Sequence, residues 1–156
     1  MKVADLNPKQ VFSIFDDITR IPRPSKKEEK IRQYLLDFAK KHNLEAKTDK
    51  VGNVLIKAPA TPGHEQAPTV ILQGHMDMVC ESNDKSFNFE TTPITTIVDG
   101  EWVHADGTTL GADNGIGVAA SLAVMTDPEC VHGPLEALFT MDEETGMTGA
   151  CLLYTS

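Results

Sequence analysis

The sequence predicts an α/β sandwich with a mixed, mostly parallel sheet. Two short apolar runs, residues 69–79 (TVILQGHMDMV) and 135–141 (LEALFTM), have the length and composition of buried strands. Between them, residues 115–125 (GIGVAASLAVM) form a small-residue segment long enough for a helix that packs closely on a sheet. Strands that alternate with helices indicate helices layered on a sheet, and 156 residues suit one domain.

The N-terminal 45 residues predict two amphipathic helices. Asn7 and Pro8 are typical of an N-cap followed by proline in the first helical position. Apolar residues then recur at helical spacing until the two prolines of IPRPS end the helix. Ser25 and Glu28 have the spacing of a capping box, which predicts a second helix that ends near Asn43.

The remainder of the chain predicts mainly strands. Apolar and polar residues alternate only weakly in residues 44–50, whereas residues 51–58 (VGNVLIKA) have a clearer strand pattern. Residues 69–79 are predicted to form a central strand buried on both faces. The dipeptide Asp99-Gly100 inside ITTIVDGEWVHAD predicts a β-hairpin.

Charge is distributed unevenly along the chain. The net charge is −9, and all 14 Lys and Arg lie in residues 1–85, whereas residues 86–156 hold 11 acids. Such an acidic half argues against a nucleic-acid partner, which would need basic patches. The acids are either solvated, or balanced by basic residues or by metal ions.

Three observations predict a cytoplasmic protein with no membrane partner. The N-terminus MKVADLNPKQ has no apolar segment typical of a secretory signal. No apolar run approaches the ~18 residues that a membrane span needs. The three cysteines lack CxxC spacing, which argues against a disulfide framework and against a thiolate zinc site.

The first polar cluster follows the strand of residues 69–79. His75 and Asp77 are two residues apart, so both side chains can point to one face. A histidine nitrogen is a zinc ligand, and a carboxylate on the other ring nitrogen fixes the tautomer. A histidine that only hydrogen-bonds to its neighbour is the alternative.

The second and third clusters lie beside other buried elements. Asp113 precedes a predicted helix, where the helix dipole keeps a carboxylate ionised and its two oxygens can bridge two metals. An ordinary N-cap is the alternative. Asp142, Glu143 and Glu144 follow the strand of residues 135–141, where one glutamate can ligate a metal and its neighbour can accept a proton from the metal-bound water. A solvated acidic turn is the alternative.

These clusters share one kind of structural position. In open α/β sheets, ligands bind where strands end at their carboxyl edge. One imidazole and several carboxylates form a ligand set suited to Zn, Mn or Co. A nucleotide site at GADNGIG is disfavoured because Asp113 stands where a phosphate would sit, and because no phosphate-binding lysine follows.

Several longer motifs resemble the co-catalytic zinc exopeptidases of the aminoacylase and carboxypeptidase clan, and most closely their aminoacyl-histidine dipeptidase branch. The resemblance extends from about residue 9 to residue 150. Its motifs are VFSIFDDITRIPRPSKKEE, VGNVLI, LQGHMDMV, DGEWVHADGTTLGADNGIG and HGPLEALFTMDEETGMTGA.

The resemblance implies a role for each matching residue. His75 corresponds to a ligand of one ion, Asp113 to the bridging carboxylate, whose peptide bond to Asn114 is cis in relatives, and Glu144 to a ligand of the second ion. Asp77 corresponds to the carboxylate that orients His75, and Glu143 to the general base. The implied activity is hydrolysis of dipeptides, including Xaa-His types, by two divalent ions, with zinc expected and Mn or Co compatible.

The resemblance also implies an architecture, a three-layer sandwich with a separate lid and dimerisation domain. Residues 1–150 correspond to the N-terminal part of the catalytic domain, and no downstream carboxylate or distal histidine ligand follows them. We therefore expect these 156 residues alone to be inactive, and a full-length form to be a homodimer. Residues 151–156 (CLLYTS) depart from the family pattern and are predicted to be a non-native tail.

Other functions stay open at this point. A tripeptidase, a carboxypeptidase or an N-acyl amino acid hydrolase of the same clan would use the same ligands. A non-catalytic remnant of such an enzyme is the remaining alternative.

Overall fold

The structure, a computed structural model, describes residues 1–153. A short 3₁₀ helix η1 (Val3–Asp5) precedes two helices, α1 (Lys9–Thr19) and α2 (Glu29–Lys41). Both are amphipathic, and their apolar faces supply Ile14, Phe15 and Leu35 to the core. Within the described residues, no helix has the length and apolar character needed to cross a membrane.

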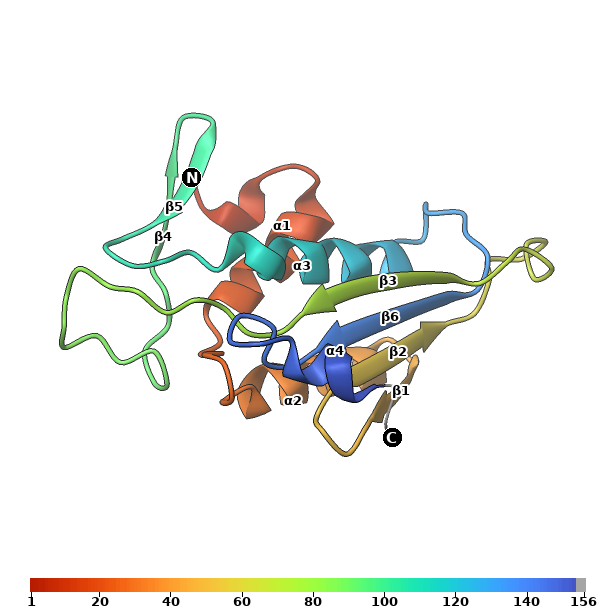
Figure 1. The fold of residues 1–156 in the computed structure, drawn as a ribbon. Helices are drawn as coiled ribbons and strands as arrows, with labels where there is room; N and C mark the ends of the chain where they lie inside the picture. Colours follow the sequence, from red (N-terminus) through yellow and green to blue (C-terminus); the bar gives the residue numbers. More distant parts are fainter. Residues whose placement is uncertain (154–156) are drawn as a thin grey trace.

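A four-stranded mixed sheet forms the centre of the molecule, in the order β1-β2-β6-β3 (Figure 1). Its strands are β1 (Glu45–Thr48), β2 (Val54–Ala58), β3 (Val70–His75) and β6 (Leu135–Thr140). The β1–β2 and β2–β6 pairings are antiparallel, and only β3 and β6 pair in parallel. The predicted α/β class with a mixed sheet is confirmed, but the described strands are less parallel than predicted, because β2 pairs in antiparallel fashion with both of its neighbours.

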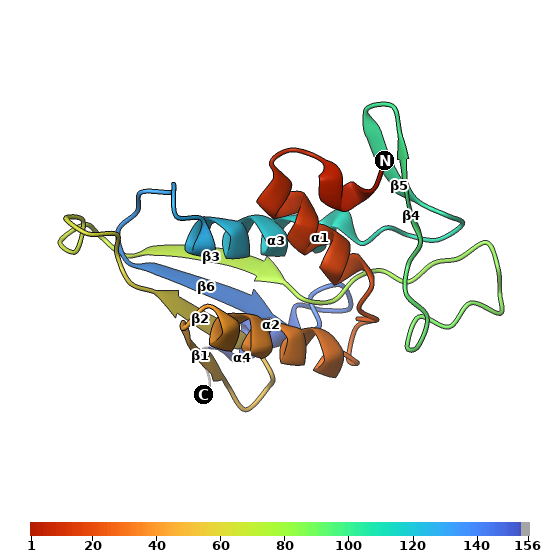
Figure 2. The same ribbon diagram turned by 180° about the vertical axis from the view of Figure 1, so that it is seen from behind.

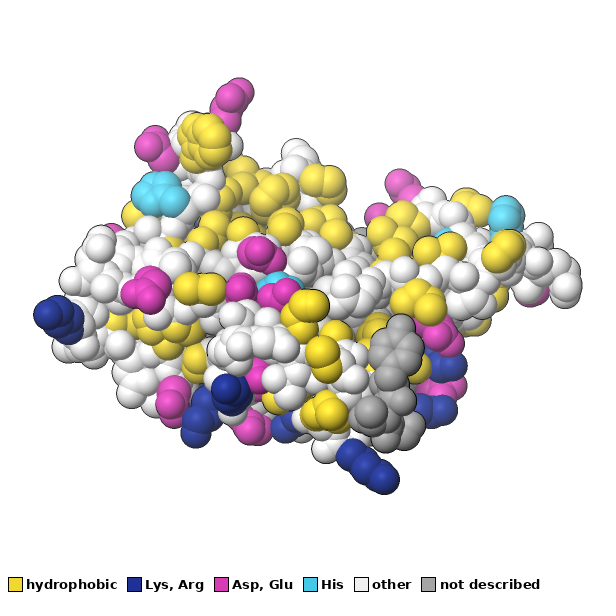
Figure 3. All heavy atoms as spheres, in the orientation of Figure 1, with side chains coloured by type: hydrophobic (Ala, Val, Ile, Leu, Met, Phe, Trp, Pro, Cys, Tyr) yellow, Lys and Arg dark blue, Asp and Glu magenta, His cyan; other side chains and the backbone are white. Residues whose placement is uncertain are grey.

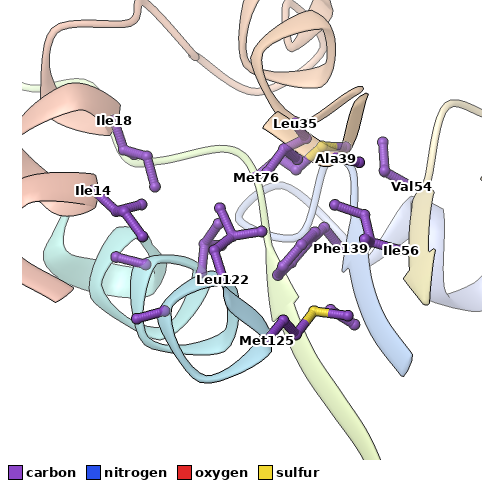
Figure 4. Close-up of a cluster of buried hydrophobic side chains, with 14 of the residues drawn as sticks. Ile14, Ile18, Leu35, Ala39, Val54, Ile56, Met76, Leu122, Met125 and Phe139 are labelled. Carbon is purple, nitrogen blue, oxygen red and sulfur yellow. The ribbon is translucent and has the colours of Figure 1, made fainter. Parts of the chain in front are cut away.

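Three helices cover one face of this sheet. Helix α3 (Ala112–Thr126) packs on β3 and β6, α2 packs on β1 and β2, and α1 packs against α3. Figure 4 shows side chains of all three helices meeting the inward residues of β2 and β6 in one cluster, including Ile56, Leu122 and Phe139, each fully buried. Seen from behind, α2 lies in front of the sheet, whereas the short helix α4 (Thr148–Leu152) lies on its opposite side (Figure 2).

The predicted hairpin projects from the body of the molecule (Figure 1). Strands β4 (Thr96–Asp99) and β5 (Trp102–Ala105) pair in antiparallel fashion around the turn at Gly100, where φ is +57°. A positive φ favours glycine in this turn. The prediction of a hairpin from Asp99-Gly100 is therefore confirmed.

Two local predictions differ from the structure. Helix α1 begins at Lys9 with Pro8 as its N-cap residue, so Asn7 lies one position before the cap. Strand β3 lies at the edge of the described sheet, and its first residues are open, with Val70 50% and Ile71 61% exposed. The apolar residues at its start are therefore not buried, and within β3 only Gly74 and His75 are buried, so the prediction of a central strand buried on both faces is wrong for the described sheet.

The segment predicted as a non-native tail, residues 151–156, is only partly described. Cys151 and Leu152 belong to α4, and Leu153 is its C-cap residue. The last three positions, 154–156, lie outside the described residues.

Candidate metal centre

His75 is the last residue of β3, and its imidazole faces acids on both sides. Its side chain is 8% exposed. On one side, Nδ1 lies 3.3 Å from the Oδ1 atom of Asp77 and 3.1 Å from the carbonyl oxygen of Asp77. On the other side, Nε2 lies 3.0 Å from Asp113 Oδ1 and 3.7 Å from Glu143 Oε2. The ring is thus held through Nδ1 and presents Nε2 to the carboxylates.

Three predicted ligands converge on one point. His75, Asp113 and Glu144 each offer a ligand atom, and these atoms all lie within 4.8 Å of one another. The parallel pairing of β3 with β6 sets His75 opposite Thr140, so the two strands end at the same edge. Figure 3 shows acidic side chains gathered around a histidine on this face of the molecule. The shared strand edge explains why residues far apart in sequence meet there.

Asp113 reaches the site from the start of α3. Asp113 and Asn114 depart from helical geometry, and the peptide bond between them is cis, as the resemblance implies. The regular helix therefore begins after them, and the Asp113 side chain stands clear of it, 82% exposed. An exposed carboxylate at this position is accessible to a bound ion.

Asp77 ties His75 to the loop that follows β6. The Asp77 carboxylate is fully buried, and it accepts hydrogen bonds from the backbone N–H of Glu143 at 3.0 Å and of Glu144 at 3.1 Å. The Ser25 hydroxyl donates a third bond at 2.7 Å. Burial alone would raise the pKa of Asp77, but these bonds and the His75 ring hold it well below its usual range. Asp77 is therefore an ionised anchor.

The charges of the site are unbalanced without a cation. Burial by itself would lower the pKa of His75. The hydrogen bonds with Asp77 and Asp113 outweigh burial and raise this pKa to about 9. Burial and the neighbouring carboxylates of Asp113 and Glu143 raise the pKa of Glu144. A divalent ion would relieve this repulsion, and an imidazole nitrogen with several carboxylate oxygens is a donor set that Zn, Mn and Co accept. The residues present therefore fit a divalent metal.

A second group of acids includes Asp77, the carboxylate that contacts His75. Ligand atoms of Glu28, Asp77 and Asp142 also lie within 4.8 Å of one another, and all three residues are buried. The Asp142 carboxylate accepts bonds from the hydroxyls of Thr145 and Thr148 at 2.5 and 2.6 Å. Because protein donors already bond these carboxylates, we interpret this group as support for the loop.

The predicted capping box of Ser25 and Glu28 is wrong. Glu28 is the N-cap residue of α2 with no side-chain cap hydrogen bond. Its Oε1 atom instead accepts bonds from the backbone N–H of Lys26 and of Asp142, each at 2.9 Å. Tertiary partners therefore replace the local bonds, and both residues support the site.

Arg23 is a further residue that sequence reasoning missed. It is 1% exposed and donates hydrogen bonds to the carbonyl oxygens of Met76, Asp77 and Gly111. The only available signal was an arginine between two prolines, a segment that the sequence analysis treated as a helix breaker.

Comparison with known proteins places the chain in a family. Residues 71–155, more than half of the chain, match peptidase family M20/M25/M40. The chain belongs to this family. It is 49% identical over 150 residues to the cytosol non-specific dipeptidase of Escherichia coli (strain K12), a match that covers 96% of this chain and 31% of that protein.

Two solved structures share the fold of this chain. The crystal structure of aminoacylhistidine dipeptidase from Vibrio alginolyticus matches with a TM-score of 0.93 and 49% identity, over 97% of this chain and 31% of that one. A tripeptidase from Staphylococcus aureus matches with a TM-score of 0.76 at 24% identity, over 94% of this chain and 39% of that one, which shows the shared fold. The chain thus spans about a third of the length of these two dipeptidases.

Proposed function

We propose that these residues form the metal-binding, water-activating part of a dipeptidase that uses two divalent ions. The observation that carries the proposal is the convergence of His75, Asp113 and Glu144 within 4.8 Å, with Glu143 Oε2 only 3.7 Å from His75 Nε2. Membership of a peptidase family supports the reaction type, hydrolysis of a peptide bond.

In this proposal, three residues hold the ions and one orients a ligand. His75 and Glu144 each supply a ligand, and the two oxygens of Asp113 are available to both ions. Asp77 fixes the His75 ring through Nδ1, which keeps Nε2 directed at the ligand cluster. When bound, such ions polarise the substrate carbonyl and ease the ionisation of water.

Glu143 is the proposed general base. Its side chain is 37% exposed, so its carboxylate can reach a substrate, while its backbone N–H is held by buried Asp77. The carboxylate accepts a proton from the attacking water and passes it to the leaving amine as the C–N bond breaks. The products are then a carboxylate and an amine, and Glu143 returns to its ionised form.

The names of two relatives support a substrate class. The Escherichia coli relative is named a cytosol non-specific dipeptidase, and the Vibrio alginolyticus relative an aminoacylhistidine dipeptidase. We therefore propose dipeptides, including Xaa-His types, as substrates of the whole protein. A cytosolic location and a homodimer belong to the same proposal, with zinc as the preferred ion.

A chimera tests the proposal directly. Residues 1–150 of this chain replace the corresponding segment of the Escherichia coli relative, to which the chain is 49% identical over 150 residues. We expect metal-dependent hydrolysis of Xaa-His dipeptides by the chimera. Glu143→Gln should lower kcat by about 100-fold or more without changing the metal content, because the substitution removes only the proton acceptor.

Glu129→Gln is the matched control, because Glu129 is an exposed residue in the loop after α3. It should leave both kcat and metal content unchanged. Full activity of the Glu143→Gln chimera would contradict the assigned role, and a chimera that binds no metal would contradict the proposed function.

A further inference from the structure

Arg23 joins two loops that carry different parts of the candidate metal centre. Its Nη1 atom donates to the carbonyl oxygens of Met76 and Asp77, each at 3.0 Å, in the segment that leaves β3. Its Nη2 atom donates to the carbonyl oxygen of Gly111 at 2.5 Å, in the segment that enters α3. The guanidinium therefore bonds both segments at once, from a position 88 residues before Gly111 in the chain.

The immediate neighbours of these bonds are the proposed ligands. Met76 and Asp77 directly follow His75, and Gly111 lies two residues before Asp113. The structure places His75 Nε2 3.0 Å from Asp113 Oδ1, so the two loops meet at the site as well as at Arg23. A shift of either loop relative to the other would therefore change the spacing of the ligands.

We infer that Arg23 is a positioning residue for the metal centre, because its guanidinium sets the loop that carries His75 against the loop that carries Asp113. The inference rests on the proposed function. Arg23 touches neither ligand, so it acts through the backbone that holds them.

The bonding pattern indicates a geometric role. In the described part of the chain, the hydrogen bonds of Arg23 all go to carbonyl oxygens, and none of the ion pairs involves Arg23. A planar guanidinium offers several donors in a fixed fork, which a lysine ammonium on a flexible stem cannot reproduce. Burial lowers the pKa of Arg23 to about 10, with the charges of Asp77 and Glu144 opposing, so it stays charged at neutral pH.

The backbone around Arg23 leaves room for the guanidinium and for little else. A Cβ atom at Gly111, where φ is +71°, would lie 2.5 Å from Arg23 Nη2. A Cβ atom at Gly115, inside α3, would lie 2.8 Å from the same atom and 3.2 Å from Phe15 Cε2. Both glycines therefore permit the close approach of Arg23 to the start of α3.

The first test is Arg23→Lys, with the affinity for zinc or manganese measured by titration calorimetry on the purified chain. The variant keeps a positive charge but loses the planar set of guanidinium N–H donors. We expect metal affinity to fall about 10-fold or more, as it does when residues that orient metal ligands are removed. An affinity equal to that of the wild type in a folded variant would overturn the inference.

Ile56→Ala separates positioning from a general loss of stability. Ile56 is fully buried in β2, and its substitution leaves a core cavity without touching the loops that Arg23 joins. We expect it to lower the thermal midpoint while metal affinity stays as in the wild type. If Ile56→Ala weakens metal binding as much as Arg23→Lys does, Arg23 has no specific role.

Gly115→Ala is the second test, and it tests the positioning role of Arg23 if the Arg23→Lys variant does not fold. Alanine favours a helix more than glycine does, and the added Cβ would lie 2.8 Å from Arg23 Nη2, so α3 can form while the guanidinium is displaced. We expect weaker metal binding in a folded variant, and unchanged binding would overturn the inference. Absence of metal binding by the wild type would instead refute the proposed function, and the inference with it.

Discussion

At the scale of single residues, the two carboxylate oxygens of Asp77 accept hydrogen bonds from three separate residues of the site. The carboxylate accepts N–H bonds from Glu143 and Glu144 and a hydroxyl bond from Ser25. In Asp77→Asn, an NH₂ group replaces one oxygen and faces an N–H donor. A buried donor left without a partner costs about 1–3 kcal/mol. We expect a loss of that size in the free energy of unfolding, measured by urea denaturation of the metal-free protein.

Asp106→Asn is the control for this prediction, because Asp106 is exposed. Substitutions at such positions usually change stability by no more than about 0.5 kcal/mol. Equal stability of the Asp77 and Asp106 variants would show that the bonds to Asp77 carry no net stabilisation.

At the scale of elements, the turn between β1 and β2 depends on one carboxylate. Asp49 Oδ1 accepts backbone N–H bonds from Val51, Gly52 and Asn53 at 2.8–2.9 Å, and Oδ2 accepts a bond from the Asn53 side chain at 2.7 Å. Burial opposes ionisation, but these four bonds lower the pKa of Asp49. The ionised carboxylate therefore fixes the turn that sets the β1–β2 register.

This lowered pKa predicts how the stability of the turn changes with pH. The folded-state pKa of Asp49 lies below its unfolded value of about 4. Its stabilisation is therefore present above that value and is lost as the pH falls through the folded-state pKa. The stability difference between wild type and Asp49→Asn should be largest at neutral pH and should shrink below about pH 4, as chemical denaturation at several pH values would show. A difference that is constant with pH would contradict the prediction.

At the scale of the whole molecule, charge couples metal binding to stability. The chain carries a net charge of −9, with no Lys or Arg after residue 85. An ion that binds only the folded state stabilises it by about 2.7 kcal/mol at 100 times Kd. We expect zinc or manganese to raise the thermal midpoint by several degrees, at roughly 2–4 °C per kcal/mol, and a chelator to reverse the shift in calorimetry.

His75→Ala is the control for metal-linked stability, with sodium chloride used to match ionic strength. The variant lacks the imidazole ligand, so its thermal midpoint should respond to metal no more than to sodium. If metal raises the thermal midpoint of the variant as much as that of the wild type, the ion binds to acidic residues away from His75.

The sequence by itself determined the features that depend on neighbouring residues. Apolar runs and helical spacing predicted the order of strands and helices, and Asp99-Gly100 predicted the hairpin. The same patterns placed His75, Asp113 and Glu144 beside the ends of buried elements, where the structure brings them together. These predictions succeed because periodicity and turn chemistry act over a few residues.

Only the tertiary structure decided how those ends are joined. Ser25 and Glu28 have the spacing of a local cap, yet they bond Asp77 and Asp142, which lie 52 and 114 residues away. Arg23 bonds backbone carbonyls, which every residue possesses, so no pattern in the sequence marks its partners. Burial makes the difference, because a polar group removed from water must find its hydrogen bonds wherever the fold supplies them.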